Sequence, residues 1–145
     1  MFRKVTDRFY ASPQIEVADL AEAEQLGVRL VINNRPEDES EDQTPGPVIE
    51  QAARAAGMDY VAIPVTHAGF SETQVTAMVE ALARTDGPVL AYCRSGTRST
   101  LLWSLAEASR GRNPQKLANQ AAGAGYDLTP VRAMIDMLAA SAPDD

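Results

Sequence analysis

The segment "VLAYCRSGTRS", residues 89–99, gathers the residue types that could perform covalent chemistry. It holds the only cysteine of the chain, Cys93, directly after an apolar run, and Arg98 follows with four residues between the two. A thiolate is a strong nucleophile, and a guanidinium can bind an oxyanion through two parallel hydrogen bonds. The segment therefore indicates a cysteine nucleophile beside an anion clamp.

The residues between Cys93 and Arg98 are typical of a backbone nest for an anion. They are polar and include Gly96, which tolerates the positive φ of a tight loop. The N-terminus of the helix expected next adds partial positive charge, which favours the thiolate over the thiol. We predict Cys93 and Arg98 to be catalytic and a binding loop made of Arg94, Ser95, Gly96, Thr97 and Ser99. The alternative is a buried structural cysteine, since free cysteine is among the most buried residue types.

The elements that must position this loop follow from hydrophobic patterning and turn residues. Strands are predicted at residues 9–13, 28–34, 58–65 and 89–93, and helices at 17–27, 47–57, 71–85, 100–111, 114–123 and 130–141. This alternation predicts one α/β domain over residues 1–145, with a mainly parallel central sheet flanked by helices on both faces. Ligands bind at the carboxyl ends of parallel strands, an edge that Arg35 would share with Cys93.

Composition narrows the classes of function. The 145 residues are 45% hydrophobic and carry a formal net charge of -7, which disfavours binding to nucleic acid or an anionic membrane. A single cysteine excludes an internal disulfide and a zinc site built on several cysteines, and we expect no metal and no cofactor. No apolar run approaches the roughly 18 residues of a membrane span, so we expect a cytoplasmic protein.

Two resemblances carry further expectations. "YCRSGTRS" resembles the active-site loop of rhodanese-type sulfurtransferases, which also place four residues between cysteine and arginine. Cysteine-dependent tyrosine and dual-specificity phosphatases have five, usually after a histidine, where this chain has Tyr92. "LVINNRPEDE", "YVAIPV" and "GPVLAYCRSGTRS" together resemble the phosphatase-like domain of the bacterial beta-lactamase-hydrolase-like proteins, over about residues 9–138.

The second resemblance implies a dual-specificity-phosphatase-like α/β fold and either phosphatase or sulfur transferase activity. Some members of that family are fused to, or encoded beside, a metallo-beta-lactamase-fold persulfide dioxygenase, which makes such an enzyme a candidate partner. The sequence contains one histidine, so we do not expect that metal site within it.

The choice between phosphorus and sulfur depends on a general acid. A phosphatase must protonate its leaving oxygen, and the loop "PVTHAGFS" offers only His67, while Asp38 or Glu39 could approach from the acidic loop at residues 35–46. Sulfur transfer needs no acid when the leaving group is a stable thiolate or sulfite. The sequence thus favours a sulfurtransferase that passes sulfane sulfur through a Cys93 persulfide, from thiosulfate or glutathione persulfide to an external thiol acceptor. The alternatives are a phosphatase acting on a phosphate ester through a Cys93 phosphocysteine, and a noncatalytic anion or phosphoprotein binding module.

Overall fold

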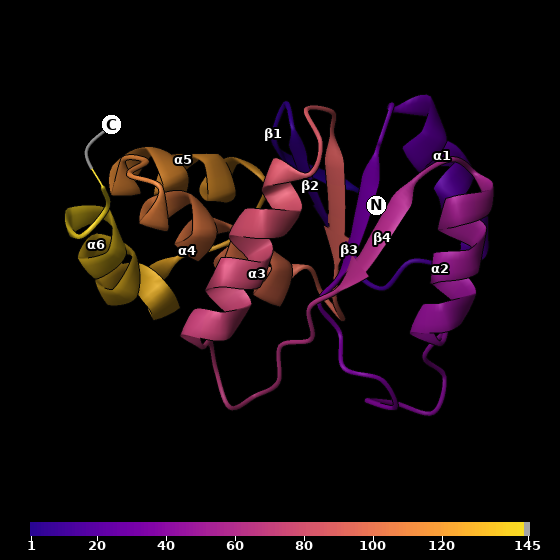
Figure 1. Ribbon diagram of the computed structural model, residues 1–145. Coiled ribbons are helices and arrows are strands. Elements are labelled where there is room, and N and C mark those ends of the chain that lie inside the picture. The colour runs from indigo at the N-terminus through magenta and orange to yellow at the C-terminus, as the bar shows by residue number, and fades with distance from the viewer. Residues whose placement is uncertain (144–145) are drawn as a thin grey trace.

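A computed structural model describes residues 1–143, which form a five-stranded sheet between two layers of helices (Figure 1). The strands are β1 (Arg3–Thr6), β2 (Phe9–Ser12), β3 (Leu30–Asn33), β4 (Asp59–Ala62) and β5 (Val89–Tyr92). Their order in the sheet is β1-β2-β5-β3-β4. The β1–β2 pair is antiparallel, and all other neighbours are parallel, which confirms the predicted mainly parallel sheet.

The helices are distributed over both faces, as the alternation of elements predicts. They are η1 (Val17–Asp19), α1 (Leu20–Gln25), α2 (Gly46–Ala55), α3 (Glu72–Ala83), α4 (Thr97–Ser109), α5 (Pro114–Gly123), η2 (Thr129–Val131) and α6 (Arg132–Ala140). In Figure 1, α3 to α6 lie on one side of the sheet and α1 and α2 on the other. Within residues 1–143, no helix combines the length and the apolar character needed to cross a membrane.

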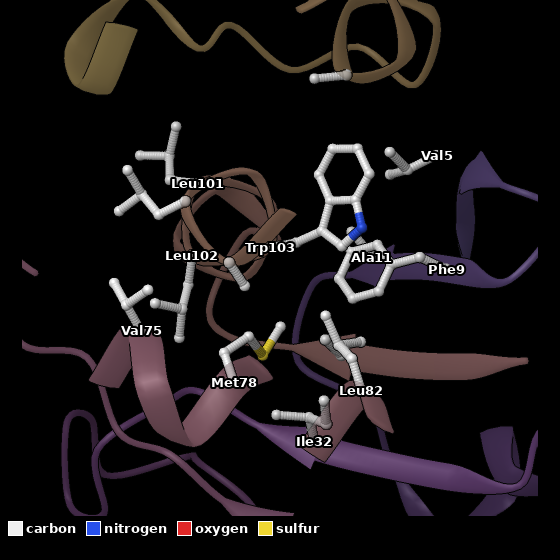
Figure 2. Close-up of a cluster of buried hydrophobic side chains, with 14 of the residues drawn as sticks. Val5, Phe9, Ala11, Ile32, Val75, Met78, Leu82, Leu101, Leu102 and Trp103 are labelled. Carbon is white, nitrogen blue, oxygen red and sulfur yellow. The ribbon is translucent and has the colours of Figure 1, made fainter. Parts of the chain in front are cut away.

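Successive side chains of a strand point to opposite faces of the sheet and pack into two separate hydrophobic cores. In β5, Val89 and Ala91 face the larger core under α3 to α6, whereas Leu90 and Tyr92 face the smaller core under α1 and α2. In the larger core the rings of Phe9 and Trp103 are stacked, with centroids 5.4 Å apart (Figure 2). This packing joins α4 to β2, so the helix that follows the cysteine loop is fixed against the sheet.

The N-terminal end of the chain differs from the prediction. The first predicted strand ends where expected, with Ser12 as its last residue, because Pro13 lacks the N–H that a ladder needs. The sequence analysis missed β1, which forms a hairpin with β2. β1 has only four residues, and two of its side chains are exposed, so it carries little hydrophobic periodicity.

The register of the parallel strands brings two candidate segments to one edge. Asn33 pairs with Tyr92 at the carboxyl ends of β3 and β5, and the backbone N–H of Asn34 donates to the Tyr92 carbonyl at 2.8 Å. Arg35 and Cys93 therefore leave the sheet at the same edge, as predicted from the strand ends.

Candidate active site

Cys93 follows β5 directly and is fully buried at the start of the loop into α4. The backbone N–H of Gly96 donates to the Cys93 Sγ at 3.1 Å. Gly96 has a φ of 92°, a left-handed conformation that glycine adopts without strain. The structure thus places one donor of the expected nest on the thiol.

The rest of the loop is held by local contacts. The Gln14 backbone N–H donates to the Arg94 carbonyl at 3.3 Å, which ties the loop to the segment after β2. The Ser95 hydroxyl lies 3.0 Å from the Thr97 hydroxyl. The side chains of Arg94, Ser95 and Thr97 are exposed, so they lie at the surface around the buried sulfur.

Ser99 sits in the first turn of α4 and is fully buried. Its hydroxyl has no hydrogen-bond partner among the described residues. Thr100, the next residue, instead donates its hydroxyl to the Gly96 carbonyl at 2.9 Å and so closes the loop onto the helix.

Arg98 is fixed by a carboxylate that comes from the acidic loop. Its Nη1 and Nη2 donate to the two oxygens of Glu39, each at 2.8 Å, and Nη1 also donates to the Val65 carbonyl at 2.7 Å. The hydrogen bonds to Glu39 raise the pKa of the Arg98 guanidinium, and the nearby Cys93 sulfur raises it further. Arg98 therefore lies beside the thiol in a single defined orientation.

These contacts leave one edge of the guanidinium free. A guanidinium has five N–H donors in a planar fork. Glu39 takes two of them and the Val65 carbonyl takes one, so two remain, Nε–H and the second N–H of Nη2. Within residues 1–143 no oxygen accepts from these two donors, while the Cys93 sulfur lies near enough to the guanidinium to interact with it. The two donors form the side edge of the fork, which can bind an oxyanion in bidentate fashion.

Glu39 cannot serve as the general acid at neutral pH. Hydrogen bonds from Arg98 and then Arg35 hold its pKa at about 2, against an ordinary value of 4.5, so the carboxylate is ionised. Arg35 is almost fully buried and donates its Nε to Glu39 at 2.9 Å and its Nη1 to Gln14 at 2.9 Å. Arg35 thus reaches the site through Glu39, which it helps to hold against Arg98.

His67 and Asp38 are placed differently from Glu39. His67 is exposed on the turn that follows Val65, whose carbonyl accepts from Arg98, so its loop begins at the site. Asp38 is exposed and has a φ of 60° in the acidic loop. Within residues 1–143 neither side chain forms a hydrogen bond to Cys93 or Arg98, so a role for either as the general acid stays a prediction.

Two contributors to the site reach it through contacts between segments that are distant in the sequence. The role of Glu39 depends on a contact with Arg98 that spans 59 residues of sequence. Tyr126, which the sequence analysis did not select, donates its hydroxyl to the Ser95 carbonyl at 3.2 Å across 31 residues. The sequence analysis named Glu39 as one of two acids that could approach the site, but it did not predict the contact with Arg98.

The chain is similar to a known protein family over most of its length. Residues 1–110 match the family described as "Beta-lactamase hydrolase-like protein, phosphatase-like domain". The beta-lactamase hydrolase-like protein of Agrobacterium fabrum is 31% identical over 141 residues, which is 97% of this chain and 33% of that protein. This chain therefore spans about a third of the length of that relative.

Two solved structures have folds similar to that of this chain. A candidate phosphatase from Neisseria meningitidis Z2491 is 34% identical, with a TM-score of 0.82 over 94% of this chain and 96% of that one. TpbA from P. aeruginosa, solved in complex with phosphotyrosine, is 18% identical, with a TM-score of 0.66 over 97% and 88% of the two chains, and it bears on the fold alone.

The fold is dual-specificity-phosphatase-like, as expected. The chain is accordingly an enzyme of the thiolate-nucleophile class. It belongs to the beta-lactamase hydrolase-like protein family, in which it corresponds to the phosphatase-like domain.

Proposed function

We propose that the chain is a cysteine-dependent phosphatase that hydrolyses phosphate monoesters through a phosphocysteine on Cys93. The observation that carries this proposal is the free side edge of Arg98 beside a thiol that accepts from the Gly96 N–H. A phosphoryl group in that position would receive two hydrogen bonds from Arg98 and others from the loop backbone. The phosphatase-like family and fold support this choice over the sulfurtransferase favoured by the sequence.

The reaction has two steps. The Cys93 thiolate attacks phosphorus, the S–P bond forms, and the P–O bond to the leaving group breaks with its electron pair on oxygen. Water then attacks the phosphocysteine, which releases inorganic phosphate and returns the thiolate. Because Glu39 is ionised, the leaving oxygen must take its proton from His67 or from water, and substrates with stable leaving groups should react fastest.

Sulfur transfer is the second candidate, and two observations favour it. Cys93 and Arg98 are separated by four residues, and the carboxylate at the site cannot protonate a leaving group. In this reaction the thiolate attacks the sulfane sulfur of thiosulfate or glutathione persulfide, and sulfite or glutathione thiolate leaves with the electron pair. An external thiol then takes the sulfur from the Cys93 persulfide, since the chain has no second cysteine. A persulfide dioxygenase partner and a cytoplasmic location stay predictions.

One preparation tested in two assays separates these candidates. Hydrolysis of an aryl phosphate and transfer from thiosulfate or glutathione persulfide to a thiol are measured side by side, each with Cys93→Ser as the control. Aryl-phosphate hydrolysis that Cys93→Ser abolishes supports the phosphatase. Sulfur transfer lost in Cys93→Ser, with no hydrolysis, would replace it with the second candidate, and the absence of both would indicate a binding module.

A further inference from the structure

Tyr126 contacts the cysteine loop from a part of the chain outside the family match, which ends at residue 110. It lies between α5 and η2, and it is 7% exposed. Its hydroxyl donates to the carbonyl oxygen of Ser95 at 3.2 Å. The segment after α5 therefore supplies a polar contact to the loop that carries the nucleophile.

The acceptor of Tyr126 and the donor to the sulfur belong to the same peptide unit. The Ser95 carbonyl and the Gly96 N–H flank one planar bond, and in the trans form they point in opposite directions. The Tyr126 hydroxyl binds this unit at the oxygen end, and the Cys93 Sγ accepts from its nitrogen end at 3.1 Å. The peptide plane is thus fixed between a phenol and the thiol, and the hydrogen bond at the oxygen polarises the N–H that faces the sulfur.

Arg3 and Gly96 shape the site in which the Tyr126 ring lies. The Arg3 guanidinium lies 5.5 Å from the centre of the ring, and Arg3 Nη1 donates to the Ala124 carbonyl at 3.4 Å. Gly96 has no side chain, and a Cβ there would overlap the Tyr126 hydroxyl. The absence of a Cβ at Gly96 therefore lets the phenol approach the backbone of the loop.

We propose that Tyr126 is a positioning residue for the nucleophile. It holds the Ser95–Gly96 peptide so that its N–H faces Cys93, and it strengthens the hydrogen bond that stabilises the thiolate. The inference rests on the proposed role of Cys93 as the nucleophile and holds for attack on phosphorus or on sulfur. Arg98 from α4 also faces this thiol, and Glu39 from the acidic loop lies behind Arg98.

The test compares Tyr126→Phe, Tyr126→Leu and the unchanged protein. Cys93 is the only cysteine, so alkylation by iodoacetamide reports this thiol alone. The rate is measured across pH, and the ultraviolet absorbance of the thiolate is titrated in parallel, with the Cys93→Ser signal subtracted. The absorbance does not depend on access of a reagent to a buried sulfur. Tyr10→Phe removes a phenolic hydroxyl from a part-buried residue of β2, outside the cysteine loop, and it serves as the matched control.

Tyr126→Phe should slow alkylation at slightly acidic pH about threefold, and it should move the midpoint of both profiles to higher pH. The reason is the loss of the hydrogen bond from the Tyr126 hydroxyl to the Ser95 carbonyl. Tyr126→Leu should show at least the same shift, and Tyr10→Phe should behave like the unchanged protein. If Tyr126→Phe leaves both profiles unchanged, the hydroxyl does not position the peptide, and the proposal is wrong. Neither measurement needs turnover, so this result is independent of whether the proposed phosphatase activity is found.

Discussion

Replacement of Glu39 by glutamine should destabilise the protein near neutral pH and should have little effect in strong acid. Glu39 accepts from both Arg35 and Arg98, and the amide of glutamine cannot replace these two charge-assisted contacts. The pKa of Glu39 is about 2, against an ordinary value of 4.5, which corresponds to about 3 kcal/mol at about 1.4 kcal/mol per pH unit. The side chain is 15% exposed, so solvent screening lowers the expected loss to about 2 kcal/mol.

The sign of the pH dependence follows from the depressed pKa. A carboxyl group whose pKa is lower in the folded state contributes its full stability above the unfolded value of 4.5, and it loses this contribution as the pH falls through about 2. Below that pH the wild-type side chain is also neutral, so the difference between Glu39→Gln and the unchanged protein should vanish. Between pH 4.5 and about 2, the free energy of unfolding should fall less steeply in the variant than in the unchanged protein.

Urea unfolding at neutral pH and in acid measures this directly. Glu41→Gln is the matched control, because Glu41 lies in the same loop and is exposed. The expected result is a loss of about 2 kcal/mol at neutral pH for Glu39→Gln alone, which shrinks on acidification. If the free energy of unfolding of the variant were lower than that of the unchanged protein by the same amount at both pH values, the ion pairs with Arg35 and Arg98 would not be the cause of the loss.

Three further substitutions test separate parts of the site. Arg98→Lys should lower kcat/KM for an aryl phosphate at least about 100-fold, because one ammonium cannot hold Glu39 and bind an oxyanion in bidentate fashion; near wild-type kinetics would remove Arg98 from the mechanism. Gly96→Ala should reduce activity far more than Gly27→Ala, because both glycines have positive φ but only at Gly96 would a Cβ meet Tyr126; equal activity in the two variants would contradict this packing. His67→Gln should slow hydrolysis of alkyl phosphates more than of nitrophenyl phosphate, whose leaving group needs little protonation, and an equal effect on both would exclude His67 as the acid.

The parts of the fold that local pattern controls could be predicted. The apolar run before Cys93 and the polar turn with Gly96 after it are strong local signals for a strand followed by a loop. The capping box that starts α3 is present as expected, with Ser71 and Gln74 exchanging hydrogen bonds. Alternation of these elements then predicts the parallel sheet and the edge at which Cys93 lies.

The contacts that complete the site could not be predicted, because they join segments that are distant in the sequence. The acidic loop reads as a solvated surface segment, yet Glu39 is largely enclosed between two arginines. Arg35 was expected to share the sheet edge with Cys93, and the structure adds that it pairs with Glu39. A tyrosine after α5 gives no sign that it reaches Ser95, since this depends on how α5 packs against β1.

The most direct test of the central claim is the mass of the group that Cys93 carries during turnover. The protein is mixed with an aryl phosphate, quenched in acid, and examined by intact-mass and peptide mass spectrometry, with Cys93→Ser as the control. The phosphatase account predicts one phosphoryl group on the peptide that contains Cys93 and none in the variant. A single added sulfur after exposure to thiosulfate or glutathione persulfide, with no phosphoryl adduct under any condition, would contradict it.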